Sequence, residues 1–248
     1  MDDNPYLKKY ENKLPYNDKA IPESDYTNIT HKKQIREIFN KNYFKNFSDY
    51  LKTLDSPQQI NQRIKKLKEI NIQGYNNLFA KVYSLGPGER VLYYLIDSAE
   101  LGGGSSAGVD ITVNGSQYEI KGANISAASG NNIFAYGFEV SRSLDVFSII
   151  NSIYALCQQN NISIESRTEI KTSSIDALRL KMPKEYAIIE RKFAILLGSD
   201  YFKNKLIILN NNNSKNYGLV EFIGKVNADN ITIERISRGV VRPKIKIR

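Results

Sequence analysis

The feature that most constrains the fold is a predicted β-hairpin near the middle of the chain. The stretch reads GVDITVNGSQYEIKGA, and Asn114-Gly115 stands between two segments in which apolar and polar residues alternate. An Asn-Gly pair between alternating segments is the strongest short-range signal for a two-residue hairpin turn. We expect strands at about 108–113 and 116–121.

Three charged side chains converge on one face of this hairpin. Counting outward from the turn, Asp110 lies opposite Glu119, and Lys121 lies two residues further on the same face. Two opposed carboxylates repel each other unless a cation lies between them, and Mg²⁺ prefers one or two carboxylates completed by water and phosphate oxygens. Lys121 would then orient a water or offset charge on a phosphate in the transition state. The structural alternative is an ordinary cross-strand salt bridge of Lys121 with either carboxylate.

A helix at about 87–101 is expected before the hairpin, because Pro87 after Gly86 can begin a helix. Glu89 stands in its first turn, where a carboxylate serves equally well as a cap or as a catalytic group. Asp97 and Glu100, near the other end, are weaker candidates for the same site.

The remaining patterns predict a mixed α/β fold. A helix begins at Ser56-Pro57, a third strand covers 133–140, and Ser141 or Ser143 caps a helix that includes Cys157. A further helix runs from Pro183 to about Leu197, and strands follow from Leu206 to the basic tail. We divide the chain into an extended arm, a helical subregion, an α/β core, and a C-terminal β extension with a basic tail, at 1–30, 31–80, 81–210 and 211–248.

The charge balance favours a polyanionic partner. The chain has 35 Lys and Arg against 26 Asp and Glu, a net charge of +9. Basic residues without acidic neighbours gather in the tail. Such residues bind phosphates favourably, because each contact releases counterions from the nucleic acid. A solvated polar tail is the equal alternative. The candidate DNA-contacting residues are Arg142, Arg235, Arg238, Arg242, Lys244, Lys246 and Arg248.

Composition excludes several other classes. Cys157 is the single cysteine and His31 the single histidine, so no internal disulfide, Cys/His zinc site or histidine triad can form. The glycine run at 102–106 lacks the Gly-Lys-Ser/Thr ending of a phosphate loop, so no nucleotide cofactor is expected. The chain has no apolar run long enough for a membrane span and no secretory pattern at its start, so we expect a cytoplasmic protein.

The residues resemble the PD-(D/E)XK nuclease superfamily over about 85–210. Glu89 on a helix, a Gly-rich connection, Asp110, and then Glu119-Ile120-Lys121 follow its pattern, although Val109 stands where the name-giving proline would be. The resemblance implies a restriction-endonuclease-like mixed sheet flanked by helices, in the order helix, three antiparallel strands, helix, strand. It also implies that Asp110, Glu119 and Glu89 are metal ligands and that Lys121 is the catalytic lysine.

Two functions from different classes follow. The first is a DNA endonuclease that depends on Mg²⁺, for which Mn²⁺ would substitute. The second is a structural or DNA-binding component of a phage particle, of head-completion or neck type, with little or no turnover. The arm at 1–30 would contact a second copy in a homodimer or neighbouring virion proteins, so a phage protein would be found in the host cytoplasm or in the virion.

Overall fold

The fold is mixed α/β, as predicted. The computed structural model describes Leu54 and residues 56–70, 86–96, 98–101, 109–128, 130–140, 146–212 and 216–248. The arm at 1–30, the helices expected before Leu54, the glycine run and Arg142 lie outside this set. The chain divides into two compact units, Met1–Gly104 with Asp110–Ser116 and Ser105–Val109 with Gln117–Arg248.

The helix predicted at Ser56-Pro57 is confirmed in the first unit as α3 (Pro57–Ile70). The hydroxyl of Ser56 accepts a hydrogen bond from the backbone N–H of Gln59 at 3.3 Å, which caps the first turn. Ile60 and Ile64, one turn apart, are fully buried and form its apolar face.

The second helix of this unit, α5 (Pro87–Leu95), begins where predicted but is shorter than the expected 87–101. After Leu95 the chain becomes extended and forms β1 (Ala99–Leu101), which pairs antiparallel with β2 (Ile111–Val113). The three-residue spacing of Ile96 and Ala99 suited a helix, but the pairing with β2 satisfies the backbone and buries Ala99 in a strand.

The predicted Asn-Gly turn is confirmed. Asn114 has φ 48° and Gly115 has φ 76°, the two left-handed residues of a type I′ turn. The turn joins the end of β2 at Val113 to the start of β3 (Ser116–Ala127). The first strand of the predicted hairpin is shorter than expected, since Val109 and Asp110 precede β2.

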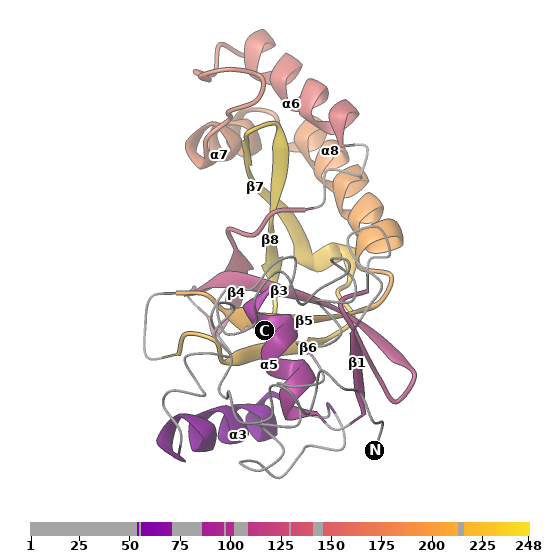
Figure 1. The fold of residues 1–248 in the computed structure, drawn as a ribbon. Helices are drawn as coiled ribbons and strands as arrows, with labels where there is room; N and C mark the ends of the chain where they lie inside the picture. Colours follow the sequence, from indigo (N-terminus) through magenta and orange to yellow (C-terminus); the bar gives the residue numbers. More distant parts are fainter. Residues whose placement is uncertain are drawn as a thin grey trace, which may run out of the picture. The chain divides into compact units, whose positions relative to one another are not determined.

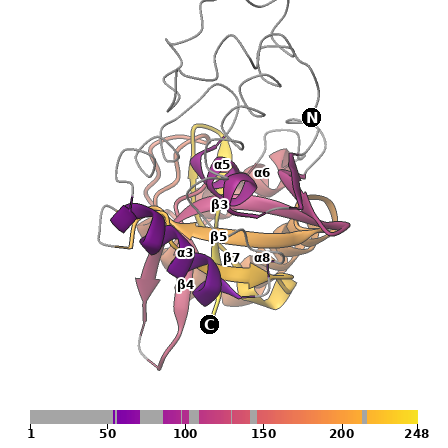
Figure 2. The same ribbon diagram turned by 60° about the horizontal axis from the view of Figure 1, so that its bottom comes forward.

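The second unit contains most of the strands, hydrogen-bonded in the order β6-β5-β3-β4-β8-β7. The long β3 pairs with β5 through its first half, in parallel, and with β4 through its second half, antiparallel (Figure 2). The strands expected from Leu206 onward are confirmed. The strands that join β3 in this unit are β4 (Ile133–Tyr136), β5 (Lys205–Asn210), β6 (Val220–Gly224), β7 (Ile231–Ser237) and β8 (Val240–Lys246).

The third strand ends earlier than the predicted 133–140 because of Gly137. This glycine has φ 81°, and a Cβ there would lie 2.6 Å from Nδ2 of Asn124. Its N–H donates to the carboxylate of Glu234 at 3.0 Å instead of to a strand partner. The chain therefore leaves the sheet directly after Tyr136.

Helices cover one face of the β7–β8 region (Figure 1). The predicted helix from Pro183 is confirmed as α8 (Pro183–Leu196), which continues into a π-helical turn, Leu197–Tyr201. The helix through Cys157 is confirmed as α6 (Phe147–Gln159), but its N-cap is Val146 and not the predicted Ser141 or Ser143, which lie outside the described residues. Helix α7 (Thr172–Lys181) was not predicted. A short 3₁₀ helix, Ala228–Asn230, precedes β7.

The core of this unit lies between these helices and the sheet. Ile153 and Phe193 from the helices and Ala135, Ile233 and Ile245 from the strands are completely buried in it. In the part of the chain that the structure describes, no helix is long and apolar enough to cross a bilayer.

Candidate active site

Glu119 and Lys121 form a close ion pair on β3. Their side chains are two residues apart and so lie on the same face of the strand. Nζ of Lys121 lies 2.6 Å from Oε1 of Glu119, and the two side chains are 21% and 5% exposed. The structure thus brings together the carboxylate and the amine of the predicted Glu-x-Lys pattern, and their contact is a salt bridge of the kind that the structural alternative named, within one strand.

The neighbouring strand explains why this pair is shielded from water. Glu119 is paired with Leu206 of β5 and Lys121 with Ile208, both completely buried. A carboxylate placed in such surroundings costs free energy unless a charged or hydrogen-bonding partner compensates it. Lys121 supplies that partner, and its partial exposure leaves one side of the pair open.

Tyr201, at the end of the π-helical turn, completes the surroundings of Lys121. The ammonium nitrogen lies 5.2 Å from the centre of the Tyr201 ring. Burial by itself lowers the pKa of Lys121, but Tyr201 and Glu119 outweigh it through charge and hydrogen bonding, so the pKa is raised above its ordinary value. Lys121 is therefore protonated at neutral pH and acts as a fixed positive charge.

Sequence reasoning missed Tyr201. It is one of sixteen tyrosines and follows the end of a predicted helix. The π-helical turn that directs its ring toward β3 has no sequence signature, so nothing in the pattern singled it out.

Asparagines close the end of the β3–β5 pairing, just beyond Lys121. The backbone N–H of Asn211 donates to Ala123 at 2.8 Å. The side chain of Asn212 then continues the ladder: its Oδ1 accepts from the N–H of Ile125 at 2.9 Å, and its Nδ2 donates to the carbonyl of Ile125 at 2.8 Å. This amide replaces a strand residue and holds β3 in place next to the ion pair.

Asp110 and Glu89 belong to the first unit, whereas Glu119 and Lys121 belong to the second. Asp110 is half-buried and directly precedes β2. Its position opposite Glu119 stays a prediction.

Glu89 serves as a helix cap. Its Oε1 accepts a hydrogen bond from the backbone N–H of Gly86 at 3.1 Å. Of the two roles that the sequence allowed, the structure provides the contact for capping. Glu100, the weaker candidate, is exposed on β1, and Asp97 lies outside the described residues.

Among the candidate DNA-contacting residues, Arg242 is bound within the protein. Its Nη2 lies 2.5 Å from Oε1 of Glu139, and its Nη1 donates to the carbonyl of Gly137 at 3.2 Å. The Arg242 side chain is 11% exposed, so it holds the segment after β4 against β8.

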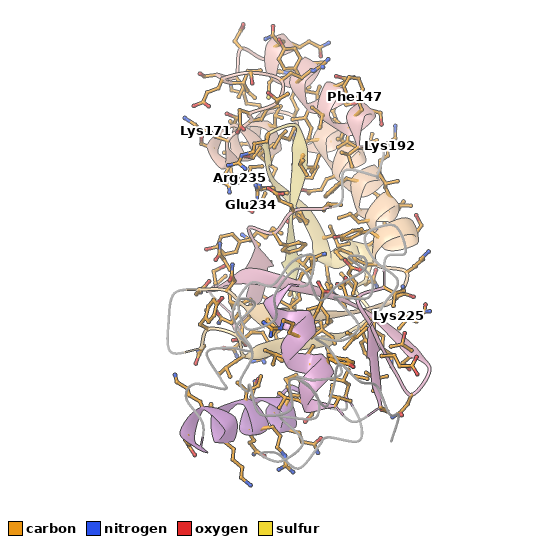
Figure 3. All side chains as sticks on the ribbon, in the orientation of Figure 1. Phe147, Lys171, Lys192, Lys225, Glu234 and Arg235 are labelled. Carbon is orange, nitrogen blue, oxygen red and sulfur yellow. The ribbon has the colours of Figure 1, made fainter. Side chains whose placement is uncertain are left out.

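The other basic candidates lie toward the surface. Arg235 on β7 is 43% exposed, with its Nε 4.0 Å from the neighbouring Glu234 (Figure 3). Arg238, in the turn between β7 and β8, is exposed, as are Lys246 and Arg248, while Lys244 is partly exposed. Nη2 of Arg248 donates to the carbonyl of Glu221 at 3.3 Å.

The acidic side chains near Lys121 meet the needs of a hard divalent cation such as Mg²⁺ only in part. Among the described residues, Glu119 is the one acidic residue that is fully buried, and no three His, Cys, Asp or Glu side chains gather closely enough to hold a metal. Mg²⁺ needs only one or two carboxylates when water and a phosphate supply the other oxygens. Glu119 suits one such position.

Comparisons of the chain with protein-family models, with curated proteins and with solved structures found no match.

Proposed function

We propose that the chain is a metal-dependent nuclease that hydrolyses DNA phosphodiester bonds, with endonucleolytic cleavage favoured. The observation that carries this proposal is the shielded ion pair of Glu119 and Lys121, 2.6 Å apart on one face of β3. The carboxylate can hold a cation that binds the phosphate. The protonated lysine, on the same face of the strand, can offset the negative charge that the phosphate gains in the transition state.

The order of the elements supports the resemblance to the PD-(D/E)XK superfamily. Helix α5 is followed by β1, which is antiparallel to β2, and by a type I′ turn into β3. After β4 come the helices α6 to α8 and then β5, which is parallel to β3. This is the order helix, three antiparallel strands, helix, strand, with β4 and two further helices inserted.

Each residue has a separate role in the proposal. Glu119 and, as the resemblance implies, Asp110 would hold Mg²⁺ through carboxylate oxygens, and a bound Mg²⁺ supplies charge that polarises the phosphate and acidifies a water. Lys121 keeps its proton, so it would contact a phosphate oxygen and offset the charge that develops there.

Glu89 and the basic residues contribute outside this centre. Glu89 would position α5 through its cap at Gly86, although the resemblance also makes it a ligand. Phosphate contacts are proposed for the remaining basic candidates, whereas the contacts of Arg242 make it a positioning residue. The proposed phosphate-contacting residues are Arg142, Arg235, Arg238, Lys244, Lys246 and Arg248.

The test is cleavage of linear, circular and branched DNA by the full chain in Mg²⁺, Mn²⁺ and EDTA. We expect cutting with either metal, including cutting of closed circles, and none in EDTA. Lys121→Ala, Glu119→Gln and Asp110→Asn should each lower the rate by at least about 100-fold, since each removes a group that acts on the reacting phosphate.

A matched control is Lys205→Ala. Lys205 also lies over a tyrosine of this sheet, with its Nζ 5.6 Å from the centre of the Tyr118 ring, but it is exposed and has no carboxylate partner in the proposed site. It should cut DNA at the wild-type rate. Full activity of Lys121→Ala would overturn the proposal, and DNA binding without any cutting would favour the phage-particle function.

A further inference from the structure

We propose that one face of the β4–β8 pair binds single-stranded DNA, with bases stacked on two aromatic rings and phosphates on two lysines. The aromatic-lysine face consists of Phe134, Tyr136, Lys244 and Lys246. It lies entirely within the second unit and is separate from the Glu119 site. The choice of DNA rather than RNA rests on the proposed function, but the surface itself does not.

The strand register places these four side chains together. Phe134 is paired with Lys246 and Tyr136 with Lys244, and directly paired residues of antiparallel strands share a face. On the other side of β4, Phe134 is paired with Ser126 and Tyr136 with Asn124 of β3. Two parallel rows result, each with a polar residue, an aromatic ring and a lysine.

The opposite face of the same strands is the core. The alternate residues Ala135 and Ile245, which are paired with each other, are completely buried, and Ile247 is nearly so. They pack in the cluster that includes the helices α6 to α8. The aromatic-lysine face is therefore the outward side of this sheet, where the rings and Lys244 are partly exposed and Lys246 is exposed.

The charge of this face is positive, because each nearby carboxylate has an arginine beside it. Glu139 is paired with Arg242, and Glu234 lies 4.0 Å from Nε of Arg235. Neither Lys244 nor Lys246 has a described ion pair with a carboxylate. Nζ of Lys244 instead lies 4.5 Å from the centre of the Phe134 ring.

These features fit a single strand better than a duplex. Phe134 and Tyr136 are two residues apart, roughly 7 Å along the strand, so each ring can take a separate base. The bases of a duplex are stacked on one another and cannot reach such rings, whereas single strands combine stacking on aromatic side chains with basic contacts to the backbone. Lys244 is partly exposed, and its contact with the ring is no stronger than base stacking, so a base can displace Lys244 from Phe134 toward a phosphate.

The test is equilibrium binding of a fluorescent oligo(dT) strand to the full chain in EDTA, followed by anisotropy. Cleavage plays no part in this measurement, so its outcome is independent of the nuclease proposal. Phe134→Leu and Tyr136→Leu should each weaken binding by roughly 5- to 150-fold, the range for loss of one stacked base. Tyr136→Phe retains the ring and should bind within about two-fold of wild type.

The lysines are tested through the salt dependence. Lys244→Gln and Lys246→Gln should each reduce the slope of log affinity against log salt by roughly 0.7, as expected for one lost phosphate contact with a single strand. A duplex of the same length should bind more weakly than the single strand, and its affinity should not change with Phe134→Leu.

Phe147→Leu is the matched control. Phe147 is 54% exposed on α6 and carries a cation over its ring, Arg167 at 4.7 Å, but it lies on a different element. Its binding should equal that of wild type. The proposal would be overturned if Phe134→Leu and Tyr136→Leu both kept wild-type affinity with thermal unfolding unchanged. It would also be overturned if Phe147→Leu lost as much affinity as they do, if the wild-type chain did not bind, or if it bound the matching RNA more tightly.

Discussion

Nζ of Lys121 lies 2.6 Å from Oε1 of Glu119, and the lysine is the more exposed partner of the pair. Because the carboxylate is deeply buried, the lysine is needed for stability as well as for the proposed chemistry. Removing one partner of a buried pair leaves the other charge uncompensated.

Lys121→Met should therefore lower the free energy of unfolding by about 2 to 4 kcal/mol, measured by urea titration. The double variant with Glu119→Gln should lose less than the sum of the two single changes, because the second change removes the charge that the first left unpaired.

The pH dependence of this loss has a definite sign. Since the pKa of Lys121 is raised in the folded protein, its contribution is fully present below the unfolded-state pKa and is lost only as the pH rises through the folded-state value. The difference between wild type and the double variant, Lys121→Met with Glu119→Gln, should stay constant from about pH 6 to about pH 9. A difference that shrinks within this range would contradict the raised pKa.

Arg179 joins α7, α8 and β7 in one polar network. Its guanidinium contacts Asp176 at 2.6 Å, Glu190 at 2.9 Å and the carbonyl of Ile233 at 2.6 Å, and the same Glu190 oxygen accepts the N–H of Ile233 at 2.8 Å. Arg179→Ala should lower the free energy of unfolding by about 2 to 4 kcal/mol, because it leaves a half-buried carboxylate and a carbonyl without their donor.

Arg191→Ala is the comparison for Arg179→Ala. Arg191 is paired with Asp229, but both side chains are more than half exposed, at 54% and 71%. Exposed pairs contribute little, so this change should alter the free energy of unfolding by less than about 1 kcal/mol. Equal losses in the two variants, compared by urea titration, would show that the Arg179 network adds nothing beyond a surface pair.

The elements that the sequence predicted well are those with a local chemical signal. The Asn114-Gly115 turn and the helix starts at Pro57 and Pro183 each depend on a residue whose backbone preference is strong by itself. The proximity of Glu119 and Lys121 could be predicted for the same reason, because strand alternation alone places two such residues on one face.

The features that were missed depend on contacts between distant segments. The chain leaves α5 early because β2 pairs with residues 99–101, and it leaves β4 at Gly137 because Glu234 binds that N–H. The apolar face of helix α7 is short, so its pattern is weak in the sequence. The helix is held by the contacts of Arg179 and by burial of its apolar residues in the core. Tyr201 reaches Lys121 only through a π-helical turn, which no residue pattern predicts.

Cys157 should be unreactive in the folded protein. Its side chain is completely buried on α6, and burial raises its pKa to about 11. Thiolate is the reactive form, so alkylation by iodoacetamide at about pH 8 should be at least 100-fold slower in the native protein than in urea, as followed by mass spectrometry. Labelling at the same rate in both states would show that α6 opens readily.

Asn212 should stabilise the strand that carries the proposed site. Its amide both donates to and accepts from the backbone of Ile125, and its own N–H donates to Oδ1 of Asn210 at 2.9 Å. Asn212→Ala removes two hydrogen bonds from partly buried backbone groups and should lower the free energy of unfolding by about 1 to 3 kcal/mol.

Hydrogen exchange tests that effect locally. The amide proton of Ile125 should exchange faster in Asn212→Ala than in wild type, whereas that of Ile245, which lies in the core of β8, should change only as far as global stability falls. Asn212→Asp keeps the acceptor for the Ile125 N–H but places a carboxylate against the Ile125 carbonyl, so it should destabilise the protein at least as much at neutral pH. If Ile125 exchanges at the wild-type rate in both variants, the Asn212 amide does not hold the end of β3, and the position of Lys121 depends on the strand pairing of β3.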